Sequence, residues 1–332
     1  MDVTPGALLP MSLLTEAQAR LKPLVAIVGP TAVGKSRVAV EVAKHFNTEV
    51  LTADSRQVYR GMDLGTDKPT VSERQGIPHR LIDLAQPDEP FNAGLYRQHA
   101  MEAIEHLHQA RLIPLVVGGT GLYVRTLVRG LCEAPPADQA VRIRLQEEVR
   151  ESGVESLYRR LVAIDPVSAS KLHPHDGAKV IRALEVHQLS GKPLSAFHTS
   201  HAFGDQPYRT LLIGLDRNRD SLYRRIEARI DWQLDHGFLE ETGRLLARGY
   251  RRDSAAMKGL GYRQAAEYLA GECDYAEMVR RFKRDTRRFA KRQLTWFRRE
   301  PAIRWFEIGE SESPEHTAAR VTELIDLFLA GL

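Results

Sequence analysis

Residues Gly29-Pro30-Thr31-Ala32-Val33-Gly34-Lys35-Ser36 match the pattern G-x-x-x-x-G-K-[ST] of a phosphate-binding loop, and this stretch decides the fold. The apolar run 24–28 precedes it, and an amphipathic helical pattern starts at Gly34. A strand, this loop and a helix in that order are the context in which the pattern binds phosphate. Backbone N–H groups and the N-terminus of the helix would then face the phosphate oxygens. The sequence therefore predicts a site for a diphosphate or a triphosphate.

The residues of this loop have separate expected roles. Lys35 would contact the outer phosphates as a point charge, and the Ser36 hydroxyl would bind the Mg2+ that accompanies them. The alternative interpretation is a glycine-rich turn with a solvated lysine. The other predicted phosphate-binding or substrate-binding positions are Gly29, Pro30, Thr31, Ala32, Val33 and Gly34.

Strand and helix patterns alternate on the C-terminal side of the loop. The runs 49–53 and 112–117 predict two more strands, and the segment 93–109 between them predicts a helix. This alternation is typical of an α/β protein with a parallel sheet. Active groups in such sheets gather at the carboxyl ends of the strands. We therefore expect the loop 29–36, the turn that starts at Asp54 and the turn Gly118-Gly119-Thr120-Gly121 to meet in one cleft.

Asp54 and Thr120 are the candidate reactive residues of that cleft. Asp54 has three possible roles, which are a ligand for Mg2+, a general base and a helix cap. Thr120 lies in a glycine-rich turn, where its hydroxyl could come close to a ligand. The residue types alone leave these roles open.

The pattern changes after Cys132, where strand signals disappear for about seventy residues. The run 209–216 then looks like a return to the sheet. We therefore predict a P-loop core domain in two pieces, 21–132 and 208–332, with a helical insertion domain at 133–207. We expect residues 1–20 to be a disordered leader. Helical patterns lie near 138–151, 154–163, 176–189 and 218–299.

The segment 280–299 contains ten Lys or Arg residues and a single acidic residue, Asp285. Phe282, Phe289 and Trp296 recur every seven residues, which predicts a helical face that packs on the core while the arginines point outward. Solvated helical faces usually mix both signs of charge. Contact with a nucleic-acid backbone is therefore favoured over a merely solvated helix.

Composition excludes several classes of protein. A chain of 332 residues, of which 43% are hydrophobic and 27% charged, can bury a full core. No apolar run approaches the roughly 18 residues of a membrane span, and two cysteines are too few for a disulfide framework. We expect a cytoplasmic monomer that has no membrane partner.

Taken together, these motifs resemble the bacterial tRNA dimethylallyltransferases, also called tRNA isopentenyltransferases. The resemblance spans roughly residues 23–300 and depends on six motifs in order, of which the phosphate-binding loop is the most specific. The other motifs are Asp54-Ser55-x-Gln57-Val58-Tyr59 with Gly65-Thr66-x-Lys68-Pro69, Val117-Gly118-Gly119-Thr120-Gly121-Leu122-Tyr123, Ile181-Arg182-Ala183-Leu184-Glu185-Val186, Gly261-Tyr262-Arg263-Gln264 and Lys291-Arg292-Gln293-Leu294-Thr295-Trp296.

The resemblance implies a P-loop NTPase-like core and a defined reaction. A dimethylallyl group would pass from dimethylallyl diphosphate to the exocyclic amine of the adenosine 3′ of a tRNA anticodon, with Mg2+ as cofactor. Lys35 and Ser36 would then serve the diphosphate leaving group, and Asp54 would take the proton of the amine. Thr120 matches the threonine beside the diphosphate, and Arg225 matches an arginine that binds it.

The resemblance also implies contacts with the anticodon stem-loop of tRNA. The segment Asp54-Ser55-Arg56-Gln57 matches the one that receives the target adenosine, and Arg142 matches a contact inside the insertion. Gly177, Ala178 and Lys179 replace a polar trio that is frequent in the family, so we expect Arg182 to orient its helix. The remaining predicted tRNA contacts are Thr120, Lys179, Arg182, Lys258, Gly261, Tyr262, Arg263, Thr286, Arg287, Arg288, Lys291, Arg292 and Gln293.

Three other functions stay open at this point. A small-molecule or nucleotide kinase would use the loop for ATP, and a prenyltransferase could instead act on free adenine nucleotides. Neither substrate needs the basic segment 280–299, which argues against both. The third is an RNA-binding ATPase, in which Asp54 would only bind the metal.

Overall fold

The computed structural model of the chain describes residues 21–132, 134–201 and 206–331. The chain divides into two compact units, one of which comprises the described residues up to Val128 together with those from Pro207 onward. The other unit is Arg129–Gln206, so it begins four residues before the expected insertion 133–207 and ends one residue before its end. The expected leader at 1–20 lies outside the described residues.

The first unit is built on one parallel sheet of six strands in the order β3-β2-β4-β1-β5-β6. The central strand β1 is a fully buried run of apolar residues from Leu24 to Val28, as expected for a parallel strand covered on both faces. The predicted α/β class with a parallel sheet is therefore confirmed. The strands are β1 Pro23–Val28, β2 Val50–Thr52, β3 His79–Arg80, β4 Leu115–Gly118, β5 Arg209–Asp216 and β6 Ile303–Glu307.

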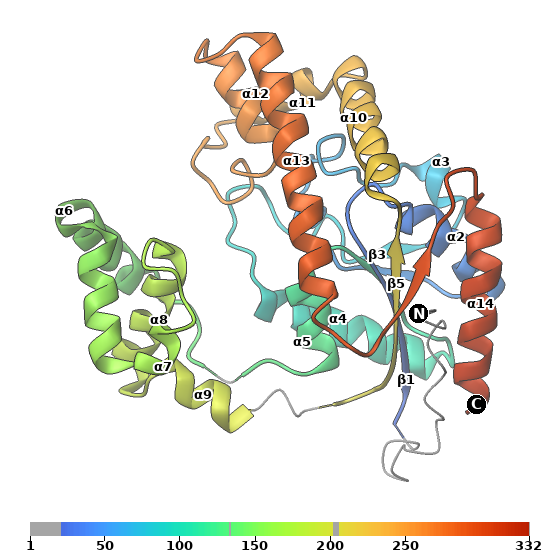
Figure 1. The fold of residues 1–332 in the computed structure, drawn as a ribbon, viewed down its shortest axis with the longest axis horizontal. Helices are drawn as coiled ribbons and strands as arrows, with labels where there is room; N and C mark the ends of the chain where they lie inside the picture. The colour runs from blue at the N-terminus through green and yellow to red at the C-terminus, as the bar shows by residue number, and fades with distance from the viewer. Residues whose placement is uncertain (1–20, 133, 202–205, 332) are drawn as a thin grey trace, which may run out of the picture. The chain divides into compact units, whose positions relative to one another are not determined.

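Helices surround this sheet, and those numbered α10 to α13 gather at one end of it, beyond the carboxyl end of β5 (Figure 1). The helix α14 packs against α2 and β5. The helix expected at 93–109 is present with those bounds. The helices of this unit are α2 Lys35–His45, α3 Val71–Arg74, α4 Ala93–Gln109, α5 Gly121–Val128, α10 Arg219–Asp235, α11 Phe238–Ala247, α12 Tyr262–Leu269, α13 Tyr275–Phe297 and α14 Pro314–Ala330.

The second unit is helical throughout its described residues and has its own apolar core, which includes Val141, Leu157 and Leu184. Its helix α6 is interrupted at Gly153, whose φ of 77° is not helical, and this explains the two separate helical patterns in that part of the sequence. The helices of this unit are α6 Gln139–Ile164, α7 Pro166–Ala169, α8 Gly177–Ser190 and α9 Leu194–His201. In neither unit is a described helix both long enough and apolar enough to cross a membrane.

The carboxyl ends of β2 and β4 come unusually close together. A Cβ atom on Gly118 would lie 2.0 Å from the carbonyl oxygen of Ala53, so only glycine fits where β4 ends. The N–H group of Thr120 then donates a hydrogen bond to that same carbonyl oxygen at 3.1 Å. This close approach fixes the second glycine-rich turn beside Asp54, which is the second residue after β2.

Candidate active site

The phosphate-binding loop joins the end of β1 to the start of α2. Gly34 has a φ of 114°, and a Cβ atom on Gly29 would lie 2.5 Å from the carbonyl oxygen of Leu215, so both positions require glycine. Helix α2 has no side-chain cap and no acidic residue in its first turn. Its first N–H groups and the positive end of its dipole therefore stay available for an anion.

The charges around the loop are mostly positive. The Lys35 ammonium donates to the carbonyl oxygen of Pro30 at 2.8 Å, and burial lowers the pKa of Lys35 to about 8 although Asp54 and Asp67 oppose the shift. Burial, Arg37 and Arg229 lower the pKa of Arg225. Burial and neighbouring cations both disfavour the charged forms of these side chains, and a bound anion would stabilise those charged forms.

Two arginines from the chain after β5 hold the loop itself. Arg225 donates from Nε to the carbonyl oxygen of Ala32 at 2.9 Å, and Arg217 donates from Nε to that of Val33 at 3.0 Å. Arg217 was not predicted from the sequence. It directly follows the carboxyl end of β5, and this position was the signal that could have identified it.

Asp54 begins a tight turn rather than a helix, so a helix-capping role is not what the structure shows. One carboxylate oxygen, Oδ1, accepts the N–H groups of Arg56 at 2.8 Å and Gln57 at 3.4 Å. The N–H group of Ser55 donates to the Thr120 hydroxyl at 3.0 Å. The turn therefore fixes the orientation of the Asp54 carboxylate, and its other oxygen accepts no hydrogen bond from the described residues.

Two cavities meet at Asp54. The first, which we call the phosphate-loop cavity, has a volume of about 460 Å3 and is lined by residues that include Lys35, Ser36 and Arg225. The second, the basic cavity, has a volume of about 610 Å3, and Lys258, Arg263, Arg284, Arg288 and Arg292 are among its lining residues. The residues that line both are Thr31, Asp54, Thr66 and Arg229. Asp54 can therefore contact a ligand in either cavity.

Gln293 of α13 connects the two glycine-rich turns. Its Oε1 accepts the N–H group of Thr31 at 2.9 Å, and its Nε2 donates to the carbonyl oxygen of Gly119 at 2.9 Å. The side chain is only 7% exposed. We predicted a tRNA contact here, but the structure uses both ends of this amide to hold the site together.

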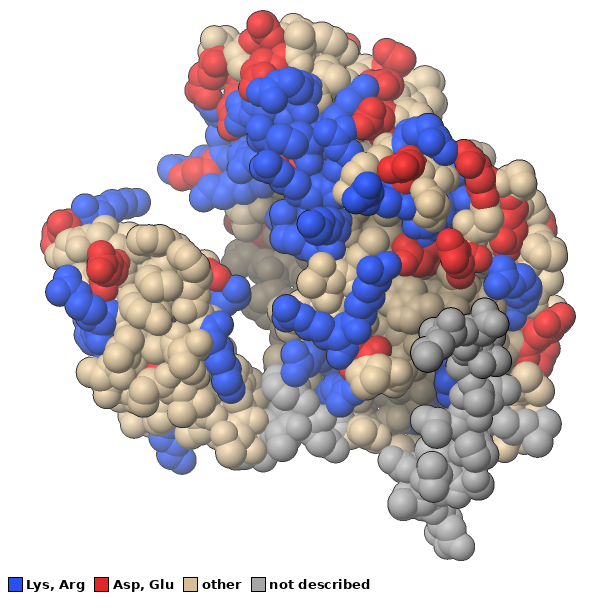
Figure 2. All heavy atoms as spheres, viewed as in Figure 1, with Lys and Arg blue, Asp and Glu red and all other residues tan. Residues whose placement is uncertain are grey.

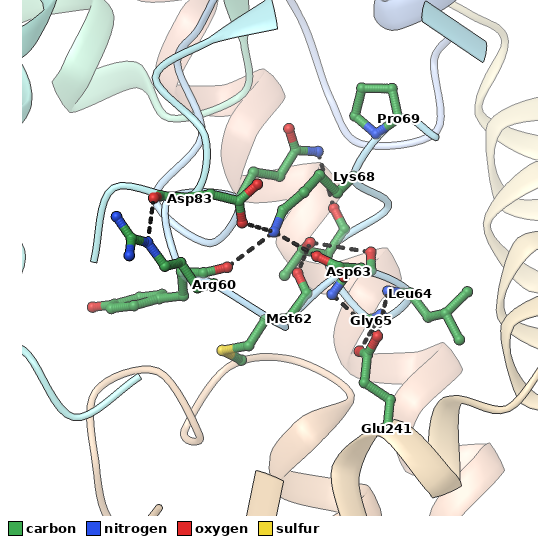
Figure 3. Close-up of polar contacts among 12 residues, drawn as sticks. Arg60, Met62, Asp63, Leu64, Gly65, Lys68, Pro69, Asp83 and Glu241 are labelled. Atoms are coloured by element: carbon green, nitrogen blue, oxygen red, sulfur yellow. Dashed lines mark hydrogen bonds and ion pairs between the residues drawn. The ribbon is translucent and has the colours of Figure 1, made fainter. Parts of the chain in front are cut away.

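The loop 62–68 contributes lining residues to both cavities and is tied to the Asp54 turn. Figure 3 shows polar contacts of this loop, among them those of Lys68 with Asp63 and Asp83. Gln57 donates from Nε2 to the carbonyl oxygens of Thr66 at 3.1 Å and Asp67 at 2.9 Å. The Lys68 side chain is 4% exposed, and its ammonium pairs with Asp63 at 2.6 Å and with Asp83 at 2.7 Å. Gln57 was expected to contact the target base, but its amide nitrogen is engaged within the protein.

Helix α13 places its basic residues largely outside, as predicted, but its buried face differs from the predicted one. Phe282 is buried, whereas Trp296 is 42% exposed and lies against Gly121. Seven residues fall about 20° short of two helical turns, so a strict seven-residue stripe drifts around the helix. The face that packs on the core consists of Met278, Phe282, Thr286, Ala290, Gln293 and Phe297.

Lys and Arg side chains gather over α13 and its neighbours (Figure 2). Several are paired with carboxylates of other helices, as Arg281 is with Glu267 at 2.7 Å and Lys283 is with Asp231 at 2.6 Å. Arg287 pairs in the same way with Glu227 of α10. Lys291 and Arg292 are exposed and have no ion pair among the described residues. Those two are therefore the best placed for a phosphate backbone.

Several other predicted tRNA contacts are buried or internally paired. Gly261 and Tyr262 are buried, and the Tyr262 hydroxyl donates to Glu241 at 2.5 Å. Thr286 is also buried and donates to the carbonyl oxygen of Phe282 at 2.9 Å. Lys258 and Arg263 are exposed, although Arg263 pairs with Asp285 at 3.2 Å. Tyr262 and Thr286 therefore make internal hydrogen bonds, and both also line the basic cavity.

In the second unit, two of the predicted contacts converge on one buried carboxylate. Glu185 is fully buried and pairs with Arg142 at 2.8 Å and with Arg182 at 2.6 Å. Arg182 also donates to the carbonyl oxygen of Pro135 at 2.7 Å, so it links α8 to the segment before α6. Lys179 is exposed and pairs with Asp176. Of the tRNA contacts predicted in this unit, Lys179 is exposed, and Arg142 and Arg182 are partly exposed.

Comparison with known proteins gives consistent matches. The model of the IPP transferase family matches residues 57–300. A tRNA dimethylallyltransferase of Syntrophobacter fumaroxidans is 50% identical over 289 residues, which are 87% of this chain and 84% of that protein. The tRNA dimethylallyltransferase of Geobacter metallireducens is 47% identical over 284 residues, which are 86% of this chain and 92% of that protein.

The chain is also similar to solved structures. The full-length tRNA isopentenylpyrophosphate transferase of Bacillus halodurans matches with a TM-score of 0.69 and 38% identity, covering 92% of this chain and 96% of that one. A eukaryotic dimethylallyltransferase acting on tRNA matches with a TM-score of 0.82 and 27% identity, covering 93% and 80%. These likenesses confirm the predicted P-loop NTPase-like core.

Proposed function

The chain belongs to the IPP transferase family, and from this premise we propose that it is a tRNA dimethylallyltransferase. It transfers a dimethylallyl group from dimethylallyl diphosphate to the exocyclic amine N6 of the adenosine 3′ of the anticodon. The observation that carries this proposal is the position of Asp54, which lines both the phosphate-loop cavity and the basic cavity. A donor and an acceptor bound in separate cavities can meet there.

The diphosphate of the donor fits the phosphate-loop cavity. The uncapped start of α2, Lys35 and Arg225 supply donors and positive charge for its oxygens. Ser36 and Asp54 line the same cavity, and their oxygens suit Mg2+, which usually takes one or two protein ligands together with substrate phosphates. When bound, Mg2+ would offset the charge that develops on the departing diphosphate.

The chemistry of the acceptor gives Asp54 its role. The adenine amine is a weak nucleophile because its lone pair is shared with the ring. As the bond from N6 to the first carbon of the dimethylallyl group forms, the bond from that carbon to the diphosphate oxygen breaks and its electron pair leaves with the diphosphate. The amine proton passes to the Asp54 carboxylate, whose orientation the N–H groups of Arg56 and Gln57 maintain.

The basic cavity is the proposed place of the target nucleotide. A base in the anticodon loop is stacked, so it must be turned out before it reaches Asp54, at a cost of about a few kcal/mol. Contacts with the backbone phosphates would offset this cost. We propose that Lys258, Arg263, Arg288, Lys291 and Arg292 make these contacts, with Arg142 and Lys179 contributing from the second unit.

A small-molecule or nucleotide kinase is not favoured. The loop would serve ATP equally well, but the relatives described above are tRNA dimethylallyltransferases over most of their length. A kinase would also leave the basic cavity without a role. We propose a soluble cytoplasmic monomer with Mg2+ as its cofactor.

Mass spectrometry of nucleosides tests the proposed function directly. When the protein is incubated with tRNA, Mg2+ and dimethylallyl diphosphate, we expect one adenosine per tRNA to gain a dimethylallyl group. The same reaction with AMP in place of tRNA is the control, and we expect no product from it. Phosphoryl transfer from ATP without any modified nucleoside would contradict the proposal, and a modified AMP would favour a free nucleotide as the acceptor.

The low pKa of Lys35 predicts that the donor binds together with a proton. The pKa of Lys35 is about 8 in the free protein, and a bound diphosphate would raise it by stabilising the ammonium form. Dimethylallyl diphosphate, whose phosphates ionise at about pH 6 or below, should therefore bind with proton uptake near pH 8.5. Its affinity should fall by up to about tenfold for each pH unit above 8. Calorimetry in two buffers of different ionisation enthalpy measures the uptake.

The matched control for this measurement is Lys35→Arg, since an arginine stays charged throughout this pH range. The variant should bind the donor without the proton uptake. Equal uptake by the variant and the original protein would mean that another group takes the proton.

A further inference from the structure

Glu241 of α11 is a buried carboxylate with four hydrogen-bond donors, and Figure 3 shows its contacts with the backbone of Asp63, Leu64 and Gly65. Its Oε2 accepts the N–H groups of Asp63 at 3.1 Å and Leu64 at 2.9 Å. Its Oε1 accepts the N–H group of Gly65 at 3.3 Å and the hydroxyl of Tyr262 at 2.5 Å. The residue is only 5% exposed. One side chain therefore fixes three consecutive backbone groups of the loop 62–68.

Burial of a carboxylate is unfavourable unless hydrogen bonds satisfy it, and here four donors face its two oxygens. Burial and the charge of Glu241 raise the pKa of Tyr262 well above its usual value, so its hydroxyl stays a donor. The backbone comes close as well, because a Cβ atom on Gly65 would lie 2.4 Å from the Phe238 ring. The hydrogen bonds to Glu241 and the close contact at Gly65 together hold the loop in one conformation. Packing alone would not fix that conformation.

The fixed loop leads directly to the junction of the two cavities. After Gly65, Thr66 lines both cavities and Asp67 lines the phosphate-loop cavity. Asp67 has a φ of 56° and pairs with Arg229 at 2.8 Å. Among the described residues, Asp67 is the only ion-pair partner of Arg229, whose buried Nε has no hydrogen bond. The position of the Arg229 guanidinium therefore depends on the shape of this loop.

We propose that Glu241 is a positioning residue for the reaction, although it lines neither cavity. It fixes residues 63–67 and, through Asp67, holds the Arg229 guanidinium beside the place where the leaving diphosphate and the amine meet. This inference extends the proposed function. It predicts that Glu241 affects diphosphate binding and turnover only by way of Arg229.

A double-mutant cycle on the full chain tests this coupling. We expect Glu241→Gln to weaken binding of inorganic diphosphate by about tenfold and Arg229→Gln to weaken it at least as much. The variant with both changes should bind diphosphate no more weakly than Arg229→Gln alone. If Glu241 acts only through Arg229, its replacement has no further effect once Arg229 has been replaced. In the transfer reaction, Glu241→Gln should lower kcat by up to ~10²-fold with little change in tRNA affinity.

The matched control is Glu240→Gln, the same chemical change at the exposed residue that precedes Glu241 on α11. It should leave diphosphate binding and kcat unchanged. Tyr262→Phe provides a milder variant that removes one donor from Glu241 and keeps the ring. Should Glu241→Gln not fold, Tyr262→Phe takes its place in the cycle, and we expect it to weaken diphosphate binding a few-fold, again without effect once Arg229 is replaced.

Additive losses in the cycle would overturn the proposal, and so would unchanged diphosphate binding in both Glu241→Gln and Tyr262→Phe. Hydrogen exchange gives an independent reading, since the amides of Asp63, Leu64 and Gly65 should exchange faster in Glu241→Gln. The binding cycle does not require prenyl transfer. If the original protein modified no tRNA, the proposed function would fail while the cycle still decided the role of Glu241.

Discussion

Replacement of Asp54 by asparagine is expected to lower kcat for dimethylallyl transfer by ~10²–10⁴-fold. Asparagine keeps the shape of the side chain, and its oxygen can still accept the N–H groups of Arg56 and Gln57. It cannot take a proton from the adenine amine. Affinity for tRNA should change no more than a few-fold. Single-turnover kinetics and tRNA binding, measured on the same preparation, separate the two effects.

The matched control is Asp88→Asn, because Asp88 is an exposed carboxylate that lines neither cavity. Unchanged turnover in Asp54→Asn would disprove the role of Asp54 as the base. A Mg2+ titration distinguishes the remaining alternative. If Asp54 mainly binds the metal, raising the Mg2+ concentration should restore much of the lost activity, whereas loss of a base persists at every concentration.

Reversal of charge at Arg288 and Arg292 is the change expected to affect tRNA binding most. Both residues line the basic cavity, and the Arg288 side chain is 66% exposed. Arg288→Glu combined with Arg292→Glu should weaken tRNA binding by at least ~10²-fold at low salt, because phosphate contacts dominate such affinities. The slope of log affinity against log salt concentration should become shallower by about 2. Binding measured over a series of salt concentrations gives both values.

Two residues at the opposite end of the strands provide a control with the same change in net charge. Lys22 and Arg111 precede β1 and β4, so they lie near the amino ends of parallel strands, away from the site. Lys22→Glu combined with Arg111→Glu should leave tRNA affinity within a few-fold. Equal weakening by both pairs would show that overall charge, rather than the basic cavity, determines tRNA binding.

Local sequence patterns predicted the core of the fold and the place of the site. The apolar run of β1, the loop after it and the uncapped start of α2 are consecutive in the chain, so their geometry follows from their order. The strand-end rule also brought Asp54 and Thr120 together, and the bond between Ser55 and Thr120 agrees with that expectation.

The sequence could not predict whether a polar side chain points to solvent or into the protein. Gln57, Tyr262, Thr286 and Gln293 are polar residues near the site, and each turned out to be hydrogen-bonded within the protein. Whether such a residue faces solvent often depends on partners that are distant in the chain, as Gln293 is from Thr31. Glu241 gave no signal for the same reason, since three of its four partners lie in a loop that precedes it by more than 170 residues.

The last strand, β6, and the last helix, α14, were not predicted from the sequence, and the reason is different. The strand β6 lies at the edge of the sheet and is half-exposed along its length, so it lacks the continuous apolar run of a central strand. The helix α14 did carry recognisable signals. Ser313 caps its start just before Pro314, and Gly331 follows its end with a φ of 79°.

The two hydrogen bonds of Gln293 have a consequence for the synthesis of the enzyme on the ribosome. A chain leaves the ribosome from its N-terminus onward. Thr31 and Gly119 have therefore both left the ribosome long before Gln293 has been synthesised. Until then, nothing joins the phosphate-binding loop to the second glycine-rich turn through α13. A nascent or prematurely terminated chain therefore lacks a finished catalytic cleft, and competence for catalysis arises only when nearly the whole polypeptide has been translated.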